Sequence, residues 1–165
     1  MVQGTINLLS KVGTVAAFLL FVSCDSLFHQ YRGVGGCWAL SDTLTFTYTP
    51  TNEEKQNCRL DIELRSSNDY KYKEIFLRVE RFSKRQKETV VDTLRCELYD
   101  DLGHTRGTTA GILWQTSFPV DTIEILPNDT VTVRVSHLMD DKQLQGVSDV
   151  GIRLSHCGRH QSLGN

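Results

Sequence analysis

The segment Arg59-Leu60-Asp61-Ile62-Glu63-Leu64-Arg65 decides the fold of this 165-residue chain. Apolar and charged side chains alternate strictly along it, and a period of two is typical of a β-strand with only one face on the core. Carboxylates on the other face of such a strand are usually solvent-facing charges. We therefore expect Asp61 and Glu63 to point into water.

The same alternation recurs along most of the chain. It is found at residues 44–49, 75–79, 94–98, 131–136 and 150–154, and no stretch beyond residue 24 has a convincing helical period over ten residues. One-sided alternation is typical of antiparallel sheets, in which one face packs on the core and the other meets water. About seven to eight such strands predict an all-β domain, an antiparallel β-sandwich, with a small β-barrel as the alternative.

The N-terminal residues have the features of a secretion signal. One basic residue, Lys11, precedes the apolar stretch 12–22, which is shorter than the about 20 residues that a membrane-spanning helix needs. The segment Leu20-Phe21-Val22-Ser23-Cys24 resembles a bacterial lipobox, in which the cysteine is acylated and the preceding peptide is removed. We expect residues 1–23 to be a lipoprotein signal peptide and Cys24 to carry a covalent lipid. The alternative is an ordinary cleaved signal or an uncleaved anchor.

The rest of the chain has the size and charge of a single secreted domain. The 165 residues less the 23 of the signal leave 142, enough for one hydrophobic core. We expect residues 24–165 to form one β-sandwich domain with a short flexible tail from about residue 156. With 18 basic and 20 acidic side chains the formal charge is −2, which argues against a nucleic-acid partner.

Four cysteines remain when the lipidated residue is set aside: Cys37, Cys58, Cys96 and Cys157. In an exported chain they are candidates for disulfides, and four cysteines allow three pairings between which the sequence does not choose. The alternative is four unpaired thiols that behave as small apolar groups. The set contains no Cys-x-x-Cys pair, so we expect no zinc site.

The candidate binding segment is Asn68-Asp69-Tyr70-Lys71-Tyr72. Two aromatic rings and an amide beside a turn can recognise a peptide, a sugar or a protein surface. The structural alternative is that Asn68 and Asp69 satisfy the turn backbone while Tyr70 and Tyr72 cover an edge of the core. The sequence does not choose between binding and this structural role.

No constellation of residues points to catalysis. The five histidines are scattered, and none has an acidic or cysteine partner at the spacing of a known nucleophilic pattern. The best candidate for a metal site is His156-Cys157 with His160, which could supply three ligands from a short segment. A pair of carboxylates for glycoside hydrolysis would need a separation that the sequence does not give. We expect a protein that is not an enzyme, with no metal and no cofactor apart from the lipid. The carboxylates considered for such a pair are Glu63, Asp69, Asp92 and Asp100.

A series of short motifs runs through nearly the whole domain in a fixed order. Single motifs are unspecific, but their order and spacing together are fairly specific. The motifs are Cys24-Asp25-Ser26, Trp38, Thr43-Leu44-Thr45-Phe46, Leu64-Arg65-Ser66-Ser67-Asn68-Asp69-Tyr70-Lys71-Tyr72, Val91-Asp92-Thr93-Leu94, Glu97-Leu98, Phe118-Pro119, His137-Leu138-Met139 and Leu144-Gln145-Gly146-Val147-Ser148-Asp149-Val150-Gly151-Ile152-Arg153.

In these motifs the chain resembles the gliding-motility lipoprotein family of the GldH type. The resemblance implies a non-catalytic envelope lipoprotein of the gliding machinery and of the protein-secretion system that shares its parts. It implies a membrane partner, reached through the lipid, and other envelope proteins as binding partners. Only one acidic residue, Asp25, lies in the six residues after Cys24, so we expect the domain to face the periplasm.

Overall fold

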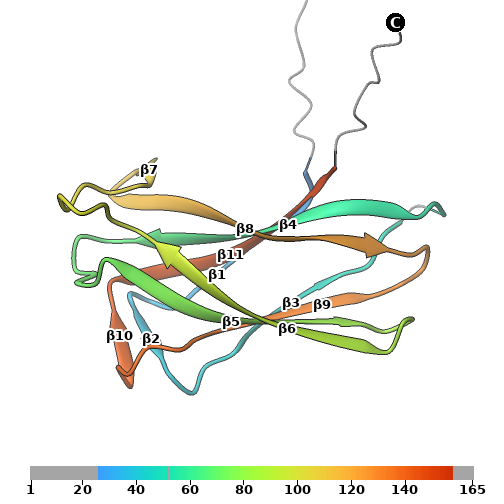
Figure 1. Cartoon of the computed structure of the whole chain (residues 1–165), viewed down its shortest axis with the longest axis horizontal. Coiled ribbons are helices and arrows are strands. Elements are labelled where there is room, and N and C mark those ends of the chain that lie inside the picture. Colours follow the sequence, from blue (N-terminus) through green and yellow to red (C-terminus); the bar gives the residue numbers. More distant parts are fainter. Residues whose placement is uncertain (1–25, 52, 158–165) are drawn as a thin grey trace, which may run out of the picture.

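The structure is a computed structural model that describes residues 26–51 and 53–157. The predicted signal peptide, residues 1–23, and the predicted lipidation site Cys24 lie outside the described residues. The regular elements of the described part are all β-strands, and their sheets pack as two layers (Figure 1). None of its residues forms a helix long and apolar enough to cross a membrane.

The first layer is a five-stranded sheet and the second a four-stranded sheet, and all their neighbouring strands are antiparallel. The five-stranded sheet has the order β1 (Ser26–Gly33), β11 (Val147–His156), β4 (Gln56–Ser66), β8 (Leu113–Ile125) and β7 (Thr108–Ala110). The four-stranded sheet has the order β3 (Leu44–Tyr48), β9 (Val131–His137), β5 (Glu74–Ser83) and β6 (Glu88–Glu97). A small ladder joins β2 (Cys37–Ala39) to β10 (Gln143–Gln145).

The predicted antiparallel β-sandwich is confirmed. Each stretch with a period of two lies in a strand or overlaps one. Strand β1 has no alternating pattern by which it could be predicted, because its residues Ser26–Gly33 mix apolar and polar side chains on both faces. Strand β11 continues to His156, the residue at which the sequence predicts the start of a flexible tail.

The core lies between the two sheets and consists of the apolar side chains that alternate along the long strands. Burial of these side chains supplies the main driving force for folding. Fully buried members include Leu60, Ile62 and Leu64 of β4, Ile75, Leu77 and Val79 of β5, Val133 and Val135 of β9, and Ile152 and Leu154 of β11.

One end of the sandwich, which we call the loop end, gathers residues 34–43, 67–73, 99–112 and 138–146 (left in Figure 1). Gly146 holds three of its loops together. Its N–H donates to the carbonyl of Gly36 (2.9 Å), and its carbonyl accepts from the N–H of Ser67 (2.8 Å). Gly146 has a φ of +86°, and a Cβ added there would lie 2.2 Å from the backbone nitrogen of Tyr70. Only glycine fits this position.

His137, at the end of β9, is buried against the ring of Trp38, with ring centroids 5.2 Å apart. Burial lowers the pKa of His137, and the backbone groups of Trp38 and Ala39, together with the negative charges of Asp141 and Asp42, only partly oppose this effect. The imidazole is therefore neutral in the folded protein at pH 7.

We expect Gly146→Ala to destabilise the fold by about 2–4 kcal/mol. The alanine would have a strained left-handed backbone conformation, and its Cβ would also clash with the backbone of Tyr70. Gly35 is the matched control, since its φ of +68° is similar but a Cβ there would meet nothing within 4 Å. Gly35→Ala should cost only the conformational part, about 1–2 kcal/mol. Urea unfolding of both variants measures the difference, and equal losses would contradict the role of the close contact.

The buried imidazole should make the fold sensitive to mild acid. The pKa of His137 is lower in the folded state than in the unfolded chain, where it is about 6.5. The unfolded chain therefore binds the proton more readily, and stability falls as the pH drops below that value. We expect the free energy of unfolding to fall more between pH 7.5 and 5.5 for the natural protein than for His137→Phe. Parallel pH dependences would contradict this expectation.

Candidate functional site

The predicted binding segment lies at the loop end and forms part of a hollow of about 380 Å³. We call this the tyrosine hollow. Tyr70 is buried and its hydroxyl donates to the carbonyl of Glu74 (2.8 Å), whereas the half-buried Tyr72 donates to a carboxylate oxygen of Asp141 (2.7 Å). The lining residues are Tyr70, Lys71, Tyr72, Lys73, Tyr99, Asp100, Asp101 and Gly103.

The other two residues of the predicted segment lie outside the tyrosine hollow and make local contacts. The side-chain oxygen of Asn68 accepts a hydrogen bond from the indole N–H of Trp114 (2.9 Å). Asp69 interacts with the hydroxyl of Ser67 through its backbone N–H and its carboxylate, at 3.2 Å each. These contacts hold the turn. Among the aromatic side chains that line the hollow, Tyr72 and Tyr99 are half-exposed, whereas Tyr70 is buried.

The four candidate disulfide cysteines are free thiols in the structure. Cys37 lies between the amides of Gln143 and Gln145. Cys58 and Cys96 are buried, and burial raises the pKa of their thiols to about 11 and about 12. Both thiols are therefore protonated and weakly nucleophilic at neutral pH.

The fourth cysteine, Cys157, is exposed beyond the end of β11. Its backbone N–H donates to the carbonyl of Asn57 (3.0 Å), which places it beside the start of β4 and near Cys58. The described residues contain no group of three or more histidine, cysteine or acidic side chains that could hold a metal ion. His160, the third member of the tail motif, lies outside the described residues.

A network of charged groups covers the outer face of the five-stranded sheet and is centred on Glu63. This carboxylate is 1% exposed and accepts hydrogen bonds from the Tyr31 hydroxyl and from Nε2 of His29 (2.8 Å). Its other oxygen lies 3.2 Å from the Arg153 guanidinium. Burial alone would raise the pKa of Glu63, but these hydrogen bonds and the charge of Arg153 lower it below its usual value. Glu63 is therefore ionised at neutral pH.

A second buried carboxylate, Asp61, lies one side-chain position along the same face of β4. It is 2% exposed and pairs with Nε of Arg59 (2.9 Å), while Nε of Arg153 lies 3.8 Å away. Arg65 stacks on the ring of Tyr31, with its guanidinium 3.9 Å from the ring centroid. The outer face of β4 is therefore covered by a layer of long polar side chains.

The prediction that Asp61 and Glu63 point into water was wrong. Their side chains do face away from the core, as the alternation requires, but side chains of β1 and β11, in the same sheet, lie beside and over them on this outer face. The histidine partner of Glu63 is 34 residues away in the sequence, so no local spacing could reveal the pair. The two carboxylate oxygens of Glu63 are both occupied by partners, which makes the network a structural one.

The other carboxylates considered for catalysis are engaged in local contacts. Asp92 binds a nitrogen of Arg81 (2.7 Å). Asp100 accepts hydrogen bonds from the backbone N–H groups of Leu102 (2.9 Å) and His104 (2.8 Å), and it lines the tyrosine hollow. These contacts shape loops and strand edges.

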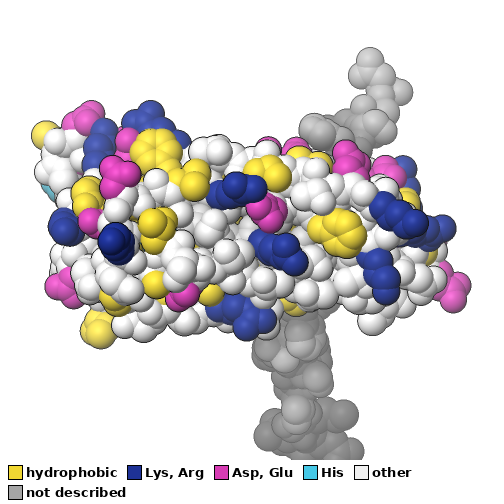
Figure 2. All heavy atoms as spheres, turned by 90° about the horizontal axis from the view of Figure 1, so that it is seen from below, with side chains coloured by type: hydrophobic (Ala, Val, Ile, Leu, Met, Phe, Trp, Pro, Cys, Tyr) yellow, Lys and Arg dark blue, Asp and Glu magenta, His cyan; other side chains and the backbone are white. Residues whose placement is uncertain are grey.

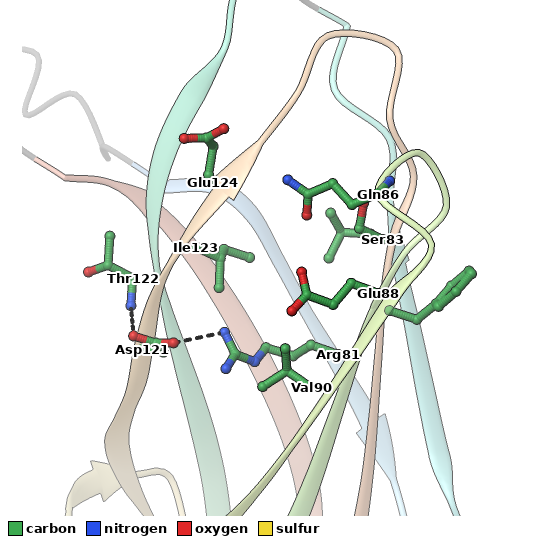
Figure 3. Close-up of a pocket in the computed structure, with 11 residues that line it drawn as sticks. Arg81, Ser83, Gln86, Glu88, Val90, Asp121, Thr122, Ile123 and Glu124 are labelled. Carbon is green, nitrogen blue, oxygen red and sulfur yellow. Dashed lines mark hydrogen bonds and ion pairs between the residues drawn. The ribbon is translucent and has the colours of Figure 1, made fainter.

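We call the side of the sandwich where β6 faces β8 the open side. It has a pocket of about 250 Å³ between the β5–β6 hairpin and β8 (Figure 3). Val90, Ile123 and Val131 form its apolar part. Arg81 bridges the two sheets there, because its guanidinium lies 2.7 Å from Asp92 on β6 and 3.0 Å from Asp121 on β8. The remaining lining residues are Phe82, Ser83, Gln86, Glu88, Thr122 and Glu124.

Comparison with known proteins identifies one family. The model of the GldH lipoprotein family matches residues 26–154. A comparison with curated proteins finds no match. Among solved structures, one of infectious bursal disease virus, Gx strain, is similar with 12% identity and a TM-score of 0.33, over 82% of this chain and 34% of the viral chain. This chain thus spans about a third of that protein.

Removing the carboxylate at the centre of the outer network should strongly destabilise the fold. Glu63→Ala leaves Arg153 without its closest partner on a mostly buried face. Removal of one partner of a buried ion pair lowers the free energy of unfolding by about 3–5 kcal/mol. Glu80→Ala is the control, because Glu80 pairs with the half-exposed Arg78 and should cost less than about 1 kcal/mol. Chemical denaturation measures both variants. A loss at Glu63 no larger than at Glu80 would mean that the network contributes little.

Proposed function

Because this chain belongs to the GldH lipoprotein family, we propose that it is a lipid-anchored accessory component of the gliding-motility machinery and of the associated protein-secretion system. It acts through protein–protein contacts, catalyses no reaction and needs no cofactor other than the lipid on Cys24. It is held in the cell envelope and faces the periplasm. The family match over residues 26–154 is the observation that carries the proposal.

The position of the first strand supports a short membrane tether. Ser26, the first residue of β1, follows Cys24 by two positions, so a lipid on Cys24 would hold the domain close to the membrane surface. Two or more acyl chains give stable anchoring. Strand β1 then runs from Ser26 toward Gly33 and the loop end, which therefore lies at the end of β1 away from the tether (Figure 1).

The distribution of exposed apolar side chains supports contacts at the loop end. Leu102 and Ile112 are 81% and 95% exposed there, and Leu40 and Leu138 are also exposed. By contrast, the face seen in Figure 2, over the four-stranded sheet, has its hydrophobic side chains scattered among basic and acidic ones. Exposed apolar groups that gather in one region are typical of protein contact sites.

A second candidate function is recognition of a carbohydrate or peptide in the tyrosine hollow. The observation in its favour is that Tyr72 and Tyr99 are half-exposed beside Lys71 and Asp101 in a hollow of about 380 Å³. Tyrosine presents a large rigid face together with a polar tip. Glycan and peptide arrays probed with the protein test this function, and loss of any signal in Tyr72→Ala would assign it to the hollow. A signal that Tyr72→Ala leaves unchanged would exclude the hollow.

Replacement of the predicted lipidated residue tests the first function directly. We expect Cys24→Ala to move the protein from the membrane fraction to the soluble fraction and to remove other envelope proteins from its affinity eluate. The domain should still fold, because the described strands begin at Ser26. Cys37→Ala is a control, since its thiol lies in the folded domain. Retention of Cys24→Ala in membranes would show that lipidation is not the attachment.

A further inference from the structure

The free edges of the two sheets differ in their capacity to accept another strand. Within the described residues, β6 is a ten-residue edge strand that pairs with β5 without any register shift. The edge strand β3 has only five residues, and β1 has a register shift near Ser26. Regular, unpaired edges are templates for pairing with another chain. Strand β6 is the longest regular edge of the described domain.

The neighbouring edge of the other sheet is formed by β8 beyond residue 115, because β7 pairs only with residues 113–115. This edge is blocked along part of its length. Strand β8 contains Pro119, which has no backbone N–H, and its pairing with β4 shifts register between Leu60 and Asp61. Proline and bulges are devices that prevent strand addition. Strand addition on the open side of the sandwich is therefore directed to β6.

The pocket on the open side lies beside the first half of β6. Glu88 and Val90 are on the inward face of this strand, and Figure 3 shows Glu88 and Gln86 directed from the hairpin toward β8. Val90, Ile123 and Val131 supply an apolar floor. Glu88 forms no ion pair among the described residues, and Glu124 pairs only with the exposed Lys55 (2.6 Å).

The charges around this pocket favour a basic side chain. Arg81 is the one basic residue that lines it, and its guanidinium is already shared between Asp92 and Asp121. Glu88 therefore leaves an unpaired negative charge at the rim, beside Glu124, whose carboxylate is shared with Lys55. A lysine or arginine places its apolar stem on hydrophobic surface and its charged head among polar groups. The pocket fits such a side chain on both counts.

We infer that β6 binds an extended segment of a partner protein as an added strand, and that a lysine or arginine of this segment occupies the pocket between Glu88 and Ile123. Backbone hydrogen bonds to β6 provide affinity, and the pocket selects the basic side chain. The inference deepens the proposed function, because it rests on the protein working through contacts and names the chemistry of one partner.

A short soluble peptide tests this site on the full-length protein purified in detergent. The probe is fluorescein-labelled Ser-Val-Thr-Lys-Thr-Val-Ser, in which valine, lysine and valine face one side of a strand. We expect saturable binding by fluorescence anisotropy, and hydrogen-exchange protection confined to β6 and the hairpin. The peptide with glutamate in place of lysine should bind at least about tenfold more weakly, which corresponds to about 1.4 kcal/mol. A peptide with all its internal amides N-methylated should not bind, because it lacks backbone donors.

Matched charge reversals locate the binding. Glu88→Lys should weaken binding of the lysine peptide about tenfold, whereas Asp140→Lys, at an exposed position of the loop end, should change it less than about twofold. Circular dichroism melts establish that both variants remain folded. Absence of binding, equal binding of the lysine and glutamate peptides, equal effects of the two variants, or binding of the N-methylated peptide would each overturn the inference. The assay needs no lipid anchor, so its failure is separate from that of the Cys24→Ala test.

Discussion

Burial of Glu63 constrains the rest of the five-stranded sheet. A buried carboxylate is tolerated only when charged or hydrogen-bonding partners surround it. The fold meets this requirement with Tyr31 and His29 from β1 and Arg153 from β11, so one side chain of β4 joins the first and last strands of the domain. The core side of β4 needs only apolar neighbours, whereas its outer side needs these particular residues in register.

The same network lies beside the predicted membrane tether. Strand β1 begins at Ser26, and its pairing with β11 extends from Ser26 to Gly33. A pull on a lipid at Cys24 would therefore be transmitted first to β1. The hydrogen bonds from His29 and Tyr31 to Glu63 add side-chain contacts to the backbone pairing of this edge strand. The ring of Tyr31 also lies against Gly151, where a Cβ would come within 2.7 Å of it. The polar layer thus stabilises the strand that a membrane-anchored domain most needs to retain.

The sequence predicts the layers of this fold better than it predicts the contacts on their surfaces. Alternation identifies β4, β5, β9 and β11 because each buries one apolar face against the opposite sheet. The same alternation cannot show what covers the other face, so Glu63 reads as exposed although β1 and β11 bury it. Strand β1 is missed for a related reason, since its role is to cover polar groups and its own sequence is mixed. Family-like motifs in the sequence indicate function where local patterns do not.

The candidate contact regions differ in chemistry and in position, which has a consequence for how the domain would join a complex. The loop end exposes Leu102 and Ile112, so contacts there depend on burial of apolar surface. The edge of β6 has backbone groups and the acidic rim of Glu88 and Glu124, so contacts there depend on hydrogen bonds and charge. Increased salt weakens contacts between exposed charges much more than apolar ones. A partner held at the loop end would therefore remain bound in salt that releases a basic strand from β6, and the two kinds of partner would be separable in one purification.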